Sequence, residues 1–186
     1  MVAADGEILS NVISSQAHHH DRYGGVVPEV ASRHHVELIN AVVAGALQGA
    51  GLGLREVGAV AATSGPGLIG ALLVGLSTAK ALAAANRLPF VSVDHLHGHV
   101  AANFLEPDPI APPFLCLIAS GGHTLVALVE DRSGYRLLGG TRDDAAGEAL
   151  DKAARLLGLG YPGGAALERL AAGGEEGAFE FPIGMR

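Results

Sequence analysis

The chain has 186 residues, a formal net charge of −7 and 4% aromatic residues, with no tryptophan. The acidic balance argues against a broad nucleic-acid footprint on this chain, and the scarcity of aromatic residues argues against a platform on which bases stack. The single cysteine, Cys116, lies in an apolar stretch and is expected as a small core residue. One cysteine cannot build a disulfide framework, which is typical of a protein of the reducing cytosol.

The first part of the chain alternates apolar strand patterns with helix patterns, as in α/β folds. In chain order we expect a strand over 7–14, a helix over 29–49, a strand over 57–63, a helix over 68–86, a strand over 90–93 and a helix over 97–104. The helix over 68–86 is interrupted by Gly70, Gly75 and Lys80, which favours a core helix over a membrane span. The run His18-His19-His20, before the glycine and proline loop over 23–28, is assigned no role.

The second part begins beyond a proline-rich stretch over 107–113, the clearest linker in the sequence. After it we expect hairpin strands over 114–119 and 124–130, a further strand over 135–141, and helices over 145–158 and 165–172. This order predicts an α/β lobe over 1–108 and the beginning of a second lobe over 109–186.

The segment His95-Leu96-His97-Gly98-His99 directly follows the apolar strand pattern over 90–93. If a helix begins at this point, His95 and His99 stand at i and i+4 on one helix face. Two imidazoles on one face can bind one transition metal. The alternative is that these histidines only satisfy polar groups at the end of a strand.

Two glycine clusters, Ser64-Gly65-Pro66-Gly67 and Ser120-Gly121-Gly122, follow predicted strands. Each is compatible with a simple tight turn, or with backbone N–H groups that bind an anion such as a phosphate. Asp143 and Asp144 suit the positive end of the helix that follows them. Asp151 lies further along that helix, so it is the better candidate for accepting a hydrogen bond from a ligand hydroxyl.

A set of motifs connects the chain with a known family. In chain order they are Ser14-Ser15-Gln16, Tyr23-Gly24-Gly25-Val26-Val27-Pro28-Glu29, Ala31-Ser32-Arg33, Gly65-Pro66-Gly67-Leu68, the histidine segment His95 to His99, Ser120-Gly121-Gly122-His123-Thr124, Asp143-Asp144-Ala145-Ala146-Gly147-Glu148 and Tyr161-Pro162-Gly163-Gly164. Through them, and over nearly its whole length, the chain resembles the TsaD family of tRNA N6-adenosine threonylcarbamoyltransferases, formerly labelled O-sialoglycoprotein endopeptidases or glycoproteases.

The resemblance implies an actin-like ATPase (ribonuclease H-like) α/β fold, with one lobe nearly complete and the start of a second. Relative to the family pattern, we expect the chain to be truncated at both ends. It begins after a first strand with a glycine-rich acidic segment, and it ends before a further metal-binding aspartate and a substrate-binding asparagine. The implied reaction transfers threonylcarbamoyl from threonylcarbamoyl-adenylate to N6 of adenosine 37 in tRNAs that read codons starting with A.

Carried over residue by residue, the resemblance implies that His95 and His99 ligate one divalent transition metal, iron or zinc. The implied nucleotide ligand is ATP or threonylcarbamoyl-adenylate, and the implied substrate-binding residues are Ile118, Ala119, Ser120, Gly121, Gly122, Asp151 and Gly164. Among these, Asp151 would contact the adenylate ribose and Gly164 would pack against the nucleoside. No catalytic residue is assigned, because the chain shows no Ser-His-Asp arrangement, which favours direct attack by the tRNA amine. His97 stands where many relatives carry glutamate and would add a ligand or change the surroundings of the metal.

The implied partners are tRNA, a paralogous TsaB-like subunit and a TsaE-like ATPase, in the cytoplasm and without a membrane. Both helices of the first lobe, over 29–49 and 68–86, are rich in small and apolar residues, so we also expect a homodimer through them, with Ala46 on the outward stripe. One alternative is a non-catalytic nucleotide-binding scaffold that pairs with a paralogous subunit. A metalloprotease would need His-Glu-x-x-His, where this chain has Leu96, and a sugar kinase would need a first phosphate loop that the sequence does not contain.

Overall fold

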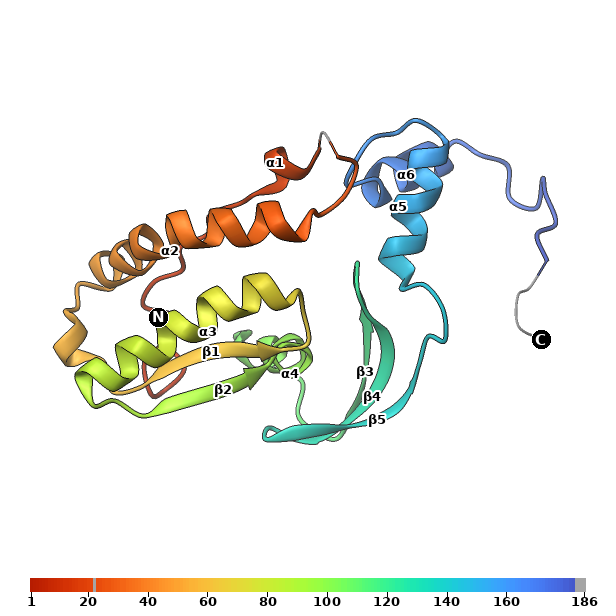
Figure 1. Ribbon diagram of the computed structural model, residues 1–186. Coiled ribbons are helices and arrows are strands. Elements are labelled where there is room, and N and C mark those ends of the chain that lie inside the picture. Colours follow the sequence, from red (N-terminus) through yellow and green to blue (C-terminus); the bar gives the residue numbers. More distant parts are fainter. Residues whose placement is uncertain (22, 183–186) are drawn as a thin grey trace.

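The computed structural model describes residues 1–21 and 23–182, which form an α/β structure with two separate sheets (Figure 1). Its elements in chain order are α1 (Ala17–Asp21), α2 (Pro28–Ala50), the short 3₁₀ helix η1 (Leu54–Glu56), β1 (Val60–Gly65), α3 (Ile69–Asn86), β2 (Phe90–Asp94), α4 (His95–Ala101), the 3₁₀ helix η2 (Ala102–Leu105), β3 (Phe114–Ala119), β4 (Thr124–Asp131), β5 (Gly134–Gly140), α5 (Ala146–Leu156) and α6 (Gly164–Ala171). The expected α/β class is confirmed.

The first sheet is a parallel pair, β1 and β2, joined through α3. α3 packs on β1, and α2 packs on the outer side of α3, so this half of the molecule is layered (Figure 1). The two helices approach closely at Gly70, where a Cβ would lie 3.1 Å from the Cβ of Ser32. Because the strands are parallel, their carboxyl ends meet at one edge, which brings Gly65 opposite Asp94.

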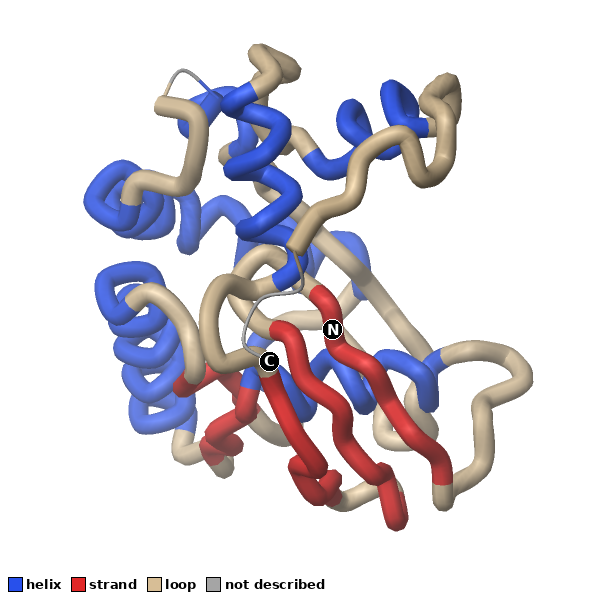
Figure 2. Tube along the Cα trace, turned by 90° about the vertical axis from the view of Figure 1, so that its right-hand side faces the viewer, coloured by secondary structure: helices blue, strands red, loops and turns tan. Residues whose placement is uncertain are grey.

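The second sheet is an antiparallel meander in the order β3-β4-β5, seen side by side in red in Figure 2. One face of it is packed, because Ile118, Leu125, Ala127 and Val129 form a buried cluster with Val100 of α4. Helix α4 therefore packs against the second sheet while it continues directly from β2 of the first. Through α4, the two sheets are held in one arrangement around the histidine segment.

Several expected elements differ from the structure. The strand expected over 7–14 is wrong: this stretch makes only an isolated bridge, Val2 to Ile8, because no further strand among residues 1–21 and 23–182 lies beside it. The short helix α1 was not expected, and it carries the three histidines that received no role. The helix expected from residue 97 begins at His95, because the Asp94 carboxylate accepts a hydrogen bond from the His97 N–H (2.8 Å) and so caps the helix.

Helix α3 is long and apolar enough to cross a membrane by length and composition, a test that core helices of soluble proteins also pass. It packs against α2 and β1 on one side, but only 11% of its residues are buried, so the expected core helix is confirmed only for that side. On that side Ala79 and Ala83 are buried, whereas Ile69 and Leu73, one turn apart, are 76% and 54% exposed. α3 therefore has an apolar face that the described part of the chain does not cover.

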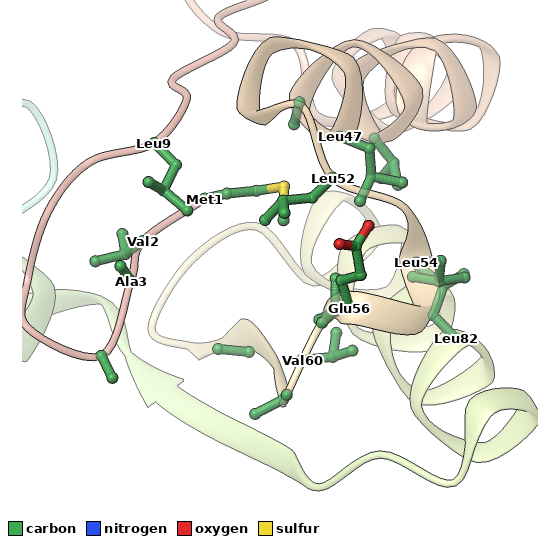
Figure 3. A pocket seen from close by; sticks show the side chains of 17 residues that line it. Met1, Val2, Ala3, Leu9, Leu47, Leu52, Leu54, Glu56, Val60 and Leu82 are labelled. Atoms are coloured by element: carbon green, nitrogen blue, oxygen red, sulfur yellow. The ribbon is translucent and has the colours of Figure 1, made fainter.

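A cavity of about 800 Å³ lies between the N-terminal segment, the end of α2 and the start of β1 (Figure 3). Its labelled side chains are apolar except for Glu56, and Met1 and Leu52 point toward one another within it. Ala46 lines this cavity, so the expectation that it lies on the outward stripe of the helix pair is wrong. The cavity lies at the Val60 end of β1, opposite the Gly65 end. It lacks the convergent polar groups of a binding site for a polar ligand.

Candidate functional site

Two histidine side chains meet at the start of α4, where β2 ends. The i and i+4 spacing places His95 and His99 on one face, with 3.2 Å between their Nε2 atoms and 4.5 Å between their ring centres. Two nitrogens that each lie about 2.0–2.1 Å from one tetrahedral zinc ion are about 3.3 Å apart. The two rings therefore lie together on one helix face, as the spacing predicted, and their separation is compatible with two ligand positions of one transition metal.

The surroundings of His95 favour the neutral form of its imidazole. Partial burial, with the neighbouring imidazoles of His99 and His123, lowers the pKa of His95 below its ordinary value, and Asp94 opposes this only in part. Among the described residues, no three histidine, cysteine or acidic side chains form a complete metal-binding group. The preformed part of the site is thus the pair itself.

His97 points away from the pair, which follows from its position at i+2 on the helix. Its ring lies 6.2 Å from the ring of Tyr135 on β5, in an edge-on arrangement. This position makes His97 a packing residue between α4 and the second sheet, and a suitable control for its two neighbours.

The Ser120-Gly121-Gly122 loop is the tight hairpin between β3 and β4, as expected. The Ser120 N–H donates to the carbonyl of His123 (2.8 Å), and the His123 N–H donates to the Ser120 hydroxyl oxygen (3.1 Å). A Cβ placed on Gly121 or Gly122 would meet nothing within 4 Å. The two glycines therefore border open space, with room for a ligand against the backbone.

Ile118 and Ala119 precede this loop on β3. The Ile118 side chain is buried in the core cluster with Val100, so only its backbone is available to a ligand. Ala119 pairs with Thr124 at the end of the hairpin.

The beginning of α5 is packed against the hairpin at Gly147. Its N–H donates to the Ser120 carbonyl (3.0 Å), and the Ala146 N–H donates to the Thr124 hydroxyl oxygen (2.7 Å). A Cβ on Gly147 would lie 2.7 Å from the Ser120 carbonyl oxygen and 2.8 Å from the backbone of Gly121. Only glycine allows this contact, and apart from the motif itself no sequence feature indicates it.

We predict that Gly147→Ala destabilises the protein by about 1–3 kcal/mol, because the added methyl group forces backbone apart where no flexible side chain can yield. The free energy of unfolding in urea measures this effect. Gly122→Ala is the matched control, since its methyl group enters open space and should leave stability nearly unchanged. Equal stability of the two variants would show that α5 does not press on the hairpin.

Asp151 lies on α5, and one of its carboxylate oxygens accepts a hydrogen bond from the Gly163 N–H (2.8 Å). The residue is thereby tied to the loop before α6, which begins at Gly164. By contrast, Asp144 and Glu148 bind Lys152 (2.7 and 2.9 Å), and their hydrogen bonds raise the pKa of that lysine. The acidic residues of this region thus fall into two groups: Asp144 and Glu148, paired with Lys152 on the surface, and the separate Asp151.

The sequence interpretation missed a contact between the glycine loop near residue 24 and helix α5. Arg155, one turn after Asp151, donates a hydrogen bond to the Gly24 carbonyl. Its guanidinium group lies against Gly24 and Gly25, where a Cβ would be 3.5 Å from Nε and Nη2, respectively. Both partners of this contact are visible in the sequence, as an arginine in the last turn of a predicted helix and as a Gly-Gly pair. Only the tertiary structure brings them together.

Known proteins resemble this chain over nearly its whole length. The family model described as "TsaD: tRNA N6-adenosine threonylcarbamoyltransferase" matches residues 7–186. A protein of Cyanothece sp. named tRNA N6-adenosine threonylcarbamoyltransferase is 57% identical over 183 residues, which cover 98% of this chain and 53% of that protein. Proteins of the same name from Clostridium perfringens and Clostridium botulinum are 55% and 53% identical, each over 95% of this chain and 52% of their own length. The chain spans about half the length of the curated relatives it matches.

Proposed function

The chain belongs to the TsaD family, the tRNA N6-adenosine threonylcarbamoyltransferases, and from this premise we propose that the protein modifies tRNA. The proposed reaction transfers threonylcarbamoyl from threonylcarbamoyl-adenylate to N6 of adenosine 37 in tRNAs that read codons starting with A. The observation that carries the proposal is the meeting of His95 and His99 with the hairpin that holds Ser120-Gly121-Gly122, since the His95 and His123 rings are 6.1 Å apart. A cation-binding pair thus lies beside a loop suited to a phosphate.

In this proposal each group has a distinct task. Backbone N–H groups of Gly121 and Gly122 bind the adenylate phosphate beside Ser120, whose own N–H donates to the His123 carbonyl. Asp151 accepts a hydrogen bond from the ribose, and Gly164 packs against the nucleoside. His95 and His99 would hold one iron or zinc ion, which supplies a positive charge for oxygens that become more negative during transfer. Two imidazole donors with their Nε2 atoms 3.2 Å apart support such an ion.

The bond changes need no covalent enzyme intermediate. The N6 nitrogen of adenosine forms a bond to the carbamoyl carbon, the bond from that carbon to the phosphate oxygen breaks, and AMP leaves with the negative charge. The amine proton passes to solvent. His95 and His99 are then metal-binding residues, and the chain needs no serine or cysteine nucleophile for this step.

The whole-protein partners are proposals as well. We place the protein in the cytoplasm with its tRNA, together with a TsaB-like subunit and a TsaE-like ATPase. We also keep the division into lobes over 1–108 and 109–186, with the packing of Val100 against the second sheet as the contact that joins them. The test incubates the protein and these partners with threonylcarbamoyl-adenylate and unmodified tRNA. Mass spectrometry should find threonylcarbamoyl-adenosine, and its absence despite adenylate binding would leave the non-catalytic scaffold as the function.

We propose that the exposed apolar face of α3 pairs with the paralogous subunit or, without it, with a second copy of this chain. An interface of ordinary size buries about 1,200–2,000 Å² in total. We predict that Leu73→Glu shifts the protein from dimer to monomer, because a charge on this face would be desolvated in the interface. Light scattering above micromolar concentration measures the change. Leu156→Glu, on an 89% exposed side chain of α5, is the control, and a monomeric unmutated chain would contradict the pairing.

A further inference from the structure

The residues of the candidate site are divided between two parts of the molecule. The histidine pair begins α4, which continues from the first sheet, whereas the glycine hairpin, Asp151 and Gly164 belong to the second sheet and its helices α5 and α6. Val100 of α4, packed in the core of the second sheet, is one tie between the parts. Figure 1 shows a second tie, away from α4, where the loop between α1 and α2 reaches α5. The relative position of the two halves of the site therefore depends on both ties.

Arg155 makes the second tie from a rigid base. It stands in the last turn of α5, next to Ala154, whose exposed fraction is 0%. Gly163 packs directly on this turn, because a Cβ there would lie 2.1 Å from the Ala154 Cβ, and its N–H donates to the Asp151 carboxylate (2.8 Å). The last turn of α5 is thus fixed to the loop before α6, so the position of Arg155 is linked to that of Asp151.

The loop on the other side of the tie is anchored as well. The Tyr23 N–H donates to the His20 carbonyl (2.9 Å), and the Val27 N–H donates to Nδ1 of His20 (3.3 Å). The His20 side chain is buried, so these two bonds hold the loop to the interior. Gly24 has a φ of 64°, in the left-handed region that favours glycine, and its carbonyl accepts the hydrogen bond from Arg155. Arg155 therefore joins two segments that are each held in place.

We propose that Arg155 is a positioning residue that fixes the second sheet and its helices in one orientation relative to the first sheet and α4. A single tie at Val100 would act as a hinge between the parts, and a second tie at a distance from it removes that freedom. A ligand whose phosphate lies on the hairpin and whose reacting carbonyl lies near the histidine pair spans both parts. A change in their orientation misplaces the reacting atoms. This inference rests on the proposed threonylcarbamoyl transfer.

Residual dipolar couplings of backbone N–H groups measure this orientation directly in the 186-residue chain. In the unmutated chain, one alignment tensor should fit the couplings from both parts, whereas in Arg155→Ala the two parts should need separate tensors. Arg155→Lys keeps a charged donor for the Gly24 carbonyl and should largely restore the single tensor. Arg169→Ala is the control: it removes the same charge from an exposed position in the last turn of α6 and should behave as the unmutated chain does.

The effect on the reaction is a split between binding and transfer. The hairpin, Asp151 and Gly164 all lie on the second part, so Arg155→Ala should bind a non-hydrolysable analogue of threonylcarbamoyl-adenylate nearly as the unmutated chain does. Transfer to tRNA, assayed with the proposed partner proteins, should fall by about 10–100-fold, since a misplacement of about 1 Å costs as much as 100-fold. A general loss of stability would instead lower binding and transfer together.

The outcomes separate this inference from the reaction on which it rests. A single tensor in Arg155→Ala would overturn the inference whatever the transfer rate, and separate tensors with unchanged transfer would overturn the positioning role. If the unmutated chain with its partners shows no transfer, the proposed function is contradicted, and the couplings still decide whether Arg155 fixes the orientation. If Arg155→Ala does not fold, Arg155→Met keeps the apolar stem, removes the donor and takes its place in the same comparisons.

Discussion

Replacing both His95 and His99 by alanine should abolish transition-metal binding and leave the fold unchanged. The two Nε2 atoms, 3.2 Å apart, are the only part of the metal site that is preformed in the described residues. Removing both leaves at most the single imidazole of His123 near the site, and one imidazole does not retain a metal at micromolar concentration. Elemental analysis after dialysis measures the result, and we expect stoichiometric iron or zinc to fall to background.

The double substitution should not damage α4. Alanine has a higher helix propensity than histidine, and the Asp94 cap that begins the helix does not depend on either ring. Circular dichroism should therefore show unchanged helical content, and His97→Ala should retain the metal. Equal metal content in the double variant and the unmutated chain would show that the ion binds elsewhere, and the proposed site would have to be abandoned.

Local sequence patterns were sufficient for most helices and strands. The helix observed at Pro28–Ala50 was expected over 29–49, and its limits follow from a proline in the first turn and Gly51 in the left-handed conformation (φ 67°) after the last. The hairpin at Ser120-Gly121-Gly122 was also expected from its flanking apolar strands. The start of α4 at His95 could have been read from Asp94, which is a strong N-cap residue immediately before it.

The errors arose where the outcome depends on distant residues. Residues 7–14 have a plausible strand pattern, but a strand requires a neighbour, and Ser10 instead binds the carbonyl of Ala46 on α2 (2.7 Å). Helix periodicity does not show which face of α2 the N-terminal segment covers. Ala46 was therefore wrongly expected on an outward stripe. The i and i+4 spacing predicted the His95 and His99 pair, whereas no spacing could place the His123 ring 6.1 Å from that of His95 or join Arg155 to Gly24.

Gly121→Val should greatly weaken binding of the adenylate and change stability little. The branched side chain would occupy the open space beside the hairpin backbone, where a Cβ meets no protein atom within 4 Å. A phosphate that approaches the loop N–H groups needs the same space, so the valine would exclude it. Loss of about two charge-assisted hydrogen bonds predicts a decrease in affinity of about 100-fold or more.

The measurement is calorimetric titration with a non-hydrolysable analogue of threonylcarbamoyl-adenylate, with thermal unfolding recorded for the same samples. Gly139→Val is the matched control: it lies on β5 and also borders open space, but no phosphate is expected there. It should bind the analogue as the unmutated chain does. A folded Gly121→Val protein with unchanged affinity would remove the hairpin from the ligand site. His123 belongs to the same hairpin, so the phosphate would then have to lie on another side of the histidine pair. Gly65-Pro66-Gly67, at the carboxyl end of β1, would be the glycine loop to examine next, because Gly65 lies opposite Asp94.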